Sequence, residues 1–426
     1  MAIAPARLTI RAYGVGFGDC FLLTFHYAGN TGDRHMLIDF GSTQRPPKAK
    51  SNLMDAIAAD IAGVVKGHLE VVVATHRHTD HISGFATDKD GKGPGNRIAS
   101  LKPAMVIQPW TERPDAPTTW RGPKASLDPA LTSSLALMSR VASVAKDESR
   151  FLSKKVRDEI QFIGADSVAN QSAVRNLARM ANKGEAVYAQ YGTRLALGRL
   201  LPGVKIKVLG PPTLEQKAGI AKQAARNRDE YWHFHSFWSL RADTSALATT
   251  GGLFPDADVY NTSQFPPETR WFIGRLKRAK GEQLLRIVRA MDDALNNTSV
   301  ILLIQAGSKK LLFPGDAQWE NWEYALRKDA SLLRNVNLYK VGHHGSLNAT
   351  PKTLWNLFSK RGDQNKRGRL TTLVSTRTNS KHGHREDHTE VPRDTLIAAL
   401  RRKSIFRSTQ ELENSGNLVL SVTFSL

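Results

Sequence analysis

A cluster of three histidines and one aspartate places the strongest constraint on the fold of this chain. The cluster follows the apolar residues 71–74 and consists of His76, His78, Asp80 and His81. A short β-branched run that ends in polar residues is typical of a buried strand that carries its polar side chains at the carboxyl-terminal edge of a sheet. Histidine and carboxylate groups at this spacing are characteristic metal ligands. His76 and His78 project from one side of the extended chain, and Asp80 and His81 approach from the following turn. These two pairs of ligands predict two metal ions.

The His-x-His-x-Asp-His run resembles the signature of the metallo-β-lactamase-fold hydrolases. The resemblance implies an α/β protein with an αββα sandwich, in which two sheets lie between layers of helices. It also implies a metal-dependent hydrolase with two divalent ions, Zn²⁺ first and Mn²⁺ as the alternative. In this family the aspartate that follows the second conserved segment supports the metal histidines without binding the ion. Here that residue is Asp39, after the apolar residues 36–38. The glycine-rich segment 14–18 also resembles a family segment, and both an ordinary turn and a direct substrate contact fit it.

Two later segments extend the resemblance. Residues 299–304 and 310–313 are predicted strands, and Asp316 follows the second of them. The resemblance makes Asp316 the bridging metal ligand. The next predicted strand, 337–341, ends in the run His343-His344-Gly345-Ser346, which resembles the branch that contains the hydrolase domain of ComEC-type DNA-uptake proteins. One of these two histidines is expected to bind metal. We favour His344 as the ligand and His343 as the residue nearer the substrate, and the reverse order is the alternative.

The ComEC-like branch tends to carry asparagine where many family members carry a further metal-binding histidine. Asn297 occupies this place, so we expect it beside the metal centre without binding the ion. The site nearest His76 and His78 is then one ligand short, which favours a weakly held ion, an oxygen-rich site or manganese. His233 and His235 could fill the vacancy, although surface or packing roles are the competing interpretation.

The resemblance also implies how the reaction proceeds. Two adjacent divalent ions lower the pKa of a shared water, supply hydroxide as the nucleophile and stabilise the charge that develops during attack. Asp80 is expected to orient the water as well as bind metal. His343 or His388 is expected to protonate the departing oxygen. His388 precedes a predicted helix near residues 395–400, and a solvated polar loop is the alternative interpretation of its surroundings.

The length of the chain leaves room for additions to a hydrolase core. We expect residues 1–426 to form a single metallo-β-lactamase-fold domain, with mainly helical insertions at about 111–190 and 213–295. Apolar residues at helical spacing support both insertions, for example Leu131 and Leu135 in the first and Leu284 and Val288 in the second. The single Cys20 excludes an intramolecular disulfide and suits a reducing cytoplasm. Since no apolar run reaches the roughly 18 residues that cross a bilayer, we expect a cytoplasmic protein that does not associate with membranes and lacks the ComEC channel.

The charge is the best indication of the substrate. The chain has 60 Lys and Arg residues against 39 Asp and Glu residues, a net charge of +21. Such an excess attracts polyanions, so nucleic acid is the expected partner. Basic residues cluster at 277–280, 360–361, 366–369 and 401–403. A nuclease or phosphodiesterase acting on DNA or RNA is the leading hypothesis. The alternative is a small-molecule hydrolase that cleaves a lactone, a β-lactam, a cyclic nucleotide or another phosphodiester. A regulatory protein that keeps the metal ligands is the third.

Overall fold

The computed structural model describes residues 3–113, 121–122, 125–126, 171–213, 216–217, 296–346, 350–378 and 390–426. The chain divides into two compact units. The first consists of residues 1–115, 170–217 and 295–426, and the second of residues 116–169 and 218–294. The described part of the second unit contains the antiparallel pair β6 (Arg121–Gly122) and β7 (Ala125–Ser126). All elements below belong to the first unit.

The first sheet has seven strands in the order β15-β1-β2-β3-β4-β5-β8. Their bounds are β1 (Pro5–Tyr13), β2 (Cys20–Tyr27), β3 (Arg34–Phe40), β4 (Val71–Val73), β5 (Met105–Pro109), β8 (Glu185–Ala189) and β15 (Val419–Ser425). The strands from β15 to β3 pair antiparallel, and those from β3 to β8 pair parallel. One face of the sheet packs against α1 (Leu53–Val65), α3 (Pro94–Ser100) and α6 (Gln171–Lys183). β4 is buried throughout, so its run of valines reflects a strand covered on both faces.

The second sheet has six strands in the order β14-β13-β12-β11-β10-β9. Their bounds are β9 (Val204–Gly210), β10 (Ile301–Ala306), β11 (Lys309–Phe313), β12 (Leu338–Lys340), β13 (Thr371–Val374) and β14 (Ile405–Ser408). β9, β10 and β11 pair antiparallel, and β11 to β14 pair parallel. The outer face packs against α10 (Trp319–Leu333), α11 (Lys352–Leu357) and α12 (Asp394–Lys403), which contribute Trp322, Leu354 and Leu400 to its core.

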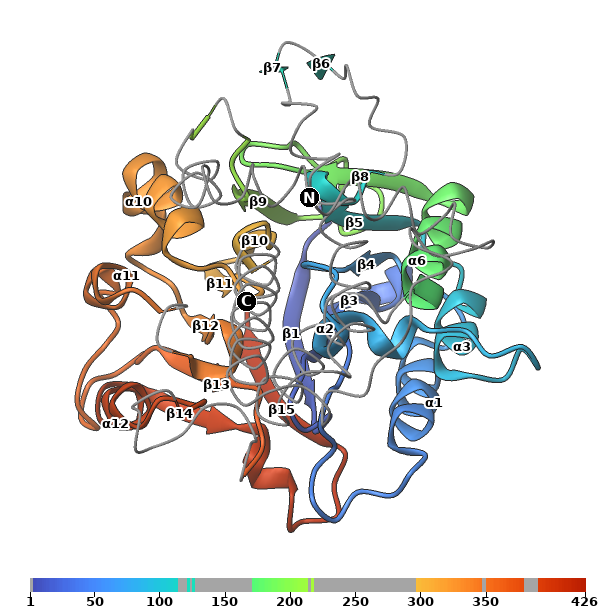
Figure 1. Cartoon of the computed structure of the whole chain (residues 1–426). Helices are drawn as coiled ribbons and strands as arrows, with labels where there is room; N and C mark the ends of the chain where they lie inside the picture. Colours follow the sequence, from blue (N-terminus) through green and yellow to red (C-terminus); the bar gives the residue numbers. More distant parts are fainter. Residues whose placement is uncertain are drawn as a thin grey trace, which may run out of the picture. The chain divides into compact units, whose positions relative to one another are not determined.

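The inner faces of the two sheets share one apolar core. Alternate residues of β1, β2 and β3 pack there with alternate residues of β10 and β11. The rings of Phe21 and Phe313, one from each sheet, lie 5.6 Å apart. Figure 1 shows the helices outside the two sheets, with α1, α3 and α6 beside the blue and green strands and α10, α11 and α12 beside the orange and red ones. The predicted αββα sandwich is confirmed.

Short helices occupy several connections. They are η1 (Gly29–Thr31), α2 (Thr79–Ile82), η2 (Ser83–Phe85), η3 (Trp110–Glu112), η6 (His343–Gly345) and η7 (Thr409–Leu412). Within the described residues, no helix has both the length and the apolar character to cross a membrane. In the first predicted insertion, α6 and β8 belong to the first unit, and β8 pairs with β5. Leu131, Leu135, Leu284 and Val288 lie outside the described residues, and the limits of both insertions stay predictions.

Candidate metal centre

The metal-ligand candidates meet where strands of both sheets end. His76 and His78 follow β4, and α2 carries Asp80 and His81. Asp316 follows β11, and His344 follows the parallel neighbour β12. Two groups of buried donor atoms form there, each with all its atoms within 4.8 Å of one another. The first group is His76, His78 and Asp80, and the second is Asp80, His81, Asp316 and His344. Asp80 belongs to both groups, so two cations held here would be neighbours.

The second group contains carboxylate oxygens suited to a cation. His81 Nε2 lies 3.1 Å from Asp316 Oδ2, and His344 Nε2 lies 2.9 Å from Asp80 Oδ2. Asp80 Oδ1 and Asp316 Oδ2 are buried and accept no hydrogen bond within the described part of the chain. The contact between His81 and Asp316 is short but lacks hydrogen-bond geometry. Because a buried carboxylate oxygen without a partner is costly, this donor set fits a divalent metal ion.

Two oxygen acceptors orient the imidazoles of the second group. His81 Nδ1 donates to Asp39 Oδ2 at 2.8 Å, and His344 Nδ1 donates to the Ser375 carbonyl at 2.9 Å. Asp39 also accepts from the Thr75 backbone N–H at 2.7 Å and the Thr75 hydroxyl at 2.8 Å. With Nδ1 donating in each ring, Nε2 is the nitrogen that faces the carboxylates, which is the orientation that a metal ligand needs. Asp39 therefore lies where the sequence predicts it, beside a candidate ligand.

The two groups differ in charge. Burial lowers the pKa of His76 well below its usual range and that of His78 to about 4, so both rings are neutral and have lone pairs for a metal. Burial also opposes a charge on His81, but the carboxylates of Asp316 and Asp39 outweigh it and raise the His81 pKa well above its usual value. Since the second group has two carboxylates, Asp80 and Asp316, and the first has only Asp80, we expect the second group to bind a cation more tightly.

The predicted residues outside these groups have different surroundings. His343 has a side chain 25% exposed, with Nε2 3.9 Å from Asp316 Oδ2, whereas His344 is fully buried. The amide of Asn297 is directed at Glu320, with Nδ2 donating to Oε2 at 3.0 Å. His388, His233 and His235 lie outside the described residues. The bridging role of Asp316, the supporting role of Asn297 and the catalytic roles of Asp80, His343 and His388 stay predictions.

An ion pair that the sequence analysis missed fixes the turn between the first two histidines. Arg77 lies between His76 and His78, and its Nε donates to Glu112 Oε1 at 2.8 Å while Nη2 donates to Oε2 at 2.6 Å. The Glu112 side chain is buried in η3, at the end of β5. A bidentate pair of this kind sets direction as well as distance. Arg77 and Glu112 therefore hold in place the segment that carries the first group.

We expect Glu112→Gln to weaken metal binding at the first group by about 10- to 100-fold, the range typical of residues that orient ligands. The variant keeps the shape of the side chain but removes the charge that fixes the guanidinium of Arg77. Competition with a chromophoric chelator measures the affinity. The exposed Glu185→Gln on β8 is the matched control and should bind metal as the parent does. Equal affinities for the two variants would show that the pair does not position the ligands.

A buried lysine also adjoins the site. Lys340, the last residue of β12, is 1% exposed, and its ammonium group forms an ion pair with Asp19 and lies 3.6 Å from Asp316 Oδ1. Burial opposes this charge, but Asp19 and Asp316 outweigh it and raise the pKa of Lys340. Asp19, Asp39 and His81 form a third group with metal-ligand spacing. Because the Lys340 ammonium group forms an ion pair with Asp19, the protein itself supplies the cation of this third group.

The glycine-rich segment before Asp19 has a packing role. A Cβ atom at Gly18 would lie 2.3 Å from the Gly41 carbonyl oxygen and 2.7 Å from that of Asp80. The Asp19 backbone N–H donates to the same Asp80 carbonyl at 2.9 Å. The absent side chain at Gly18 therefore lets this segment approach α2 and brings Asp19 beneath the second group.

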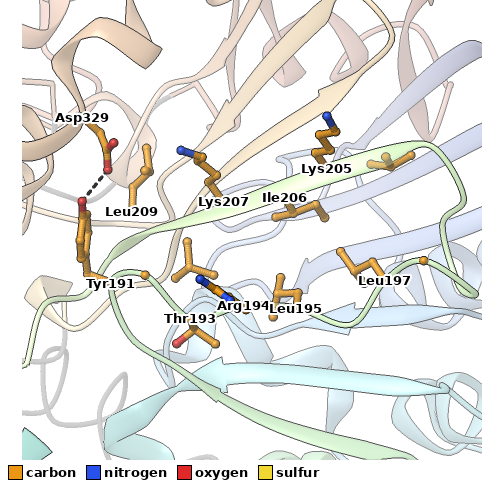
Figure 2. Close-up of a pocket in the computed structure, with 14 residues that line it drawn as sticks. Tyr191, Thr193, Arg194, Leu195, Leu197, Lys205, Ile206, Lys207, Leu209 and Asp329 are labelled. Carbon is orange, nitrogen blue, oxygen red and sulfur yellow. Dashed lines mark hydrogen bonds between the residues drawn. The ribbon is translucent and has the colours of Figure 1, made fainter. Parts of the chain in front are cut away.

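A pocket of about 570 Å³ lies apart from these groups, along β9 and the segment before it. Figure 2 shows Lys205 and Lys207 on β9 and the hydroxyl of Tyr191 directed at Asp329, to which it donates at 2.7 Å. The residues that line this pocket include none of the donor-group members. The metal centre is therefore a separate site at the edge of the sandwich.

A comparison with known families agrees with this geometry. Residues 13–139 match the model of a family described as the metallo-beta-lactamase superfamily. No curated protein matches the chain. The matched range includes the whole segment from His76 to His81 and Asp39. The chain thus contains a metallo-β-lactamase superfamily domain and is a metal-dependent hydrolase whose buried histidine and aspartate clusters could hold divalent metal ions.

Proposed function

We propose that this metal-dependent hydrolase of the metallo-β-lactamase fold cleaves phosphodiester bonds in DNA or RNA. The observation that carries the proposal is the sharing of Asp80 by two adjacent, buried donor groups. Two neighbouring divalent ions suit phosphodiester cleavage, since they stabilise both the attacking and the leaving oxygen. The net charge of +21 favours a polyanionic substrate among the many classes that this fold serves.

Each residue of the centre then has a role. His76, His78 and Asp80 would hold one ion, and Asp80, His81, Asp316 and His344 would hold the other. The ions, zinc first and manganese as the alternative, supply Lewis acidity and lower the pKa of water. Asp39 orients His81, and Asn297 has a supporting role in which it does not bind the ion. His343, the more exposed of the adjacent histidines, protonates the departing oxygen, with His388 as the alternative donor.

We further propose that the chain belongs to the ComEC-like branch of the family and lacks the membrane channel of that branch. The run from His343 to Ser346 supports it, because η6 brings His344 into the second donor group and leaves His343 accessible. Nucleic acid is then the partner. A cytoplasmic location is supported by Cys20, the one cysteine of the chain, which is buried as a free thiol.

Cleavage of labelled single-stranded DNA, duplex DNA and RNA, with added Mn²⁺ or Zn²⁺, tests the proposal. The double variant Asp80→Ala, His81→Ala serves as the inactive comparison. Cleavage by the parent alone supports a metal-dependent nuclease and identifies its nucleic acid. An absence of cleavage with either metal would refute the nuclease proposal for naked nucleic acid and direct attention to a small-molecule phosphodiester or ester.

We expect metal ions to stabilise the folded protein as well as activate it. An ion that binds only the folded state adds about 2.7 kcal/mol at a free concentration of 100 times its Kd. With an unfolding entropy of about 2.1 cal/mol/K per residue, that corresponds to a rise of roughly 3 to 4 °C in Tm for a unit of this size. A thermal melt with and without Zn²⁺ measures the shift. His76→Gln, His81→Gln should abolish it, and an undiminished shift in this variant would place the bound ion elsewhere.

A further inference from the structure

One set of strand ends in the second sheet lies on the side away from the metal centre, and we call it the far edge. Strands β11 to β14 run parallel, and Asp316 and His344 follow the carboxyl-terminal ends of β11 and β12. The amino-terminal ends of these strands therefore lie at the opposite edge, beside the carboxyl-terminal end of the antiparallel β10. From Lys309 to Asp316 the chain spans roughly 20 Å at about 3.3 Å per residue. Groups at the far edge thus cannot touch a phosphate that reacts at the metal centre.

Basic residues are aligned along this far edge by strand register. Lys205 of β9 and Lys310 of β11 both lie opposite Gln305 of β10. The alignment continues to β12, because the Lys310 backbone N–H donates to the Asn337 side chain at 3.0 Å. It reaches β13 and β14 through the Thr371 N–H, which donates to the Asn337 carbonyl at 2.8 Å, and the Ile405 N–H, which donates to the Leu370 carbonyl at 2.8 Å. Figure 1 shows β10 to β14 side by side in orange and red.

The connections between strands add more cations to the same edge. The Lys360 carbonyl accepts from the Leu370 N–H at 2.9 Å, which places Lys360 next to the start of β13. Arg369 donates to the Ser404 carbonyl at 2.7 Å, just before β14. The Lys403 carbonyl accepts from Gly362 at 2.9 Å. The full set, which we call the basic edge, is Lys205, Lys309, Lys310, Lys360, Arg369, Arg402 and Lys403.

The positive charges of the basic edge repel one another, so a bound anion would stabilise them. Burial and the neighbouring Lys309 and Lys310 lower the pKa of Lys360, so these lysines feel one another's charge. Asp363 neutralises one member, with an oxygen 2.7 Å from Lys403 Nζ. Lysines on an outermost strand commonly prevent sheet-to-sheet aggregation, and this explains Lys205 on β9. It does not explain cations at the starts of interior strands such as β11.

We propose that the basic edge binds the phosphate backbone of a nucleic acid, an inference that rests on the proposed function of the metal centre. Six strands about 4.8 Å apart span roughly 24 Å. That width equals the helix-axis length occupied by about seven phosphates of one strand of a duplex, at 3.4 Å of axis per phosphate. Because the edge lies about 20 Å from the metal centre, it holds a segment of substrate remote from the bond that breaks. It lowers KM for long nucleic acids and leaves kcat for small phosphodiesters unchanged.

A charge-matched pair of variants tests the proposal. Lys309→Gln, Lys360→Gln, Arg402→Gln removes three charges from the basic edge. Arg7→Gln, Arg97→Gln, Lys183→Gln removes three exposed charges from the part of the unit built on the first sheet. Binding of a labelled 30-mer, single-stranded or duplex, is measured by fluorescence anisotropy over a salt series. The full chain is used as purified, without added divalent metal, and the oligonucleotide is checked for intactness. The targeted side chains are exposed except those of Lys309 and Lys360, which are half-buried, so a thermal melt verifies folding.

The expected result is a shallower salt dependence for the basic-edge variant alone. Each lost phosphate contact reduces the slope of log K against log salt by about 0.9 for duplex DNA and about 0.7 for a single strand. The loss is therefore about 2.7 or about 2.1 in the two cases. Equal slopes and affinities for the two variants would overturn the proposal. So would loss of binding to phosphatidylserine vesicles with unchanged binding to the oligonucleotide, since the edge would then recognise a membrane surface.

Hydrolysis of bis(p-nitrophenyl) phosphate separates this proposal from the proposed function. If the basic-edge variant hydrolyses this small diester at the parental rate but has a raised KM for the 30-mer, both proposals are supported. If the parent cleaves nucleic acid and the basic-edge variant binds and cleaves it equally well, the basic edge is wrong and the nuclease assignment stands. If the parent binds through the basic edge but cleaves neither substrate, the failure lies with the proposed function.

Discussion

Asparagine in place of Asp80 is expected to reduce hydrolysis at least about a thousandfold, which corresponds to about 4 kcal/mol of lost transition-state stabilisation. Asp80 belongs to both donor groups, and its Oδ2 accepts from His344 Nε2 at 2.9 Å. The substitution keeps the shape of the side chain but removes the negative charge that each proposed ion requires. Both ions should therefore be lost or displaced together. The kcat for bis(p-nitrophenyl) phosphate and the metal content by mass spectrometry measure the two effects in one preparation.

Asp88→Asn is the matched control for this experiment. Asp88 is exposed and lies in the loop that follows η2, so the same change of charge and shape is made outside the donor groups. It should leave both metal content and kcat at parental values. An Asp80→Asn protein that retains its full metal content and more than a tenth of the activity would contradict the shared-ligand arrangement.

The architecture could be predicted from local patterns because the strands beside the centre are buried on both faces. The apolar runs at 36–38, 71–74, 299–304, 310–313 and 337–341 coincide with β3, β4, β10, β11 and β12. Such strands appear in the sequence as nearly continuous apolar runs, and the polar residue after each one marks the sheet edge. The candidate ligands follow β4, β11 and β12, so for these strands one pattern locates both the sheet and the place where the ligands meet.

Charge pairs beside the centre could not be predicted in the same way. Arg77 and Glu112 come from different connections, and Asp19 and Lys340 come from different sheets. Apolar periodicity reports which face of an element is buried, but it carries no information about the partner of a charged residue. The one available signal was Lys340 itself. A lysine inside a short apolar strand is rarely buried without a partner, so its position already required a carboxylate nearby.

Strand β8 was difficult to predict for a related reason. The sequence predicts a mainly helical insertion at about 111–190, and within that range β8 (Glu185–Ala189) extends the first sheet beside β5. β8 is an outermost strand, and the burial of its first residues is slight. A partly exposed outermost strand lacks the continuous apolar run by which the buried strands of the same sheet can be recognised in the sequence. Helix α6 before it is amphipathic and resembles the helices expected of an insertion.

Methionine in place of Lys340 is expected to lower the free energy of unfolding by about 3 to 5 kcal/mol, the usual cost of removing one partner from a buried ion pair. The Lys340 ammonium contacts Asp19, lies 3.6 Å from Asp316 Oδ1 and donates to the Gly315 carbonyl at 3.3 Å. Methionine fills a similar volume, so the expected loss comes from two buried carboxylates that no longer have the Lys340 ammonium group beside them. Urea unfolding in EDTA measures it, because bound metal ions would otherwise compensate for the missing charge.

A double-mutant cycle separates the ion pair from simple loss of packing. If the pair is responsible, Asp19→Asn added to Lys340→Met should restore more than half of the lost stability, because the uncompensated charge on Asp19 disappears with it. Lys207→Met on β9 changes the same residue type at an exposed position and should stay within about 0.5 kcal/mol of the parent. Additive losses in the cycle would show that Lys340 acts through packing alone. A positive coupling would instead make Lys340 the fixed counterion of Asp19, which keeps the third group closed to metal.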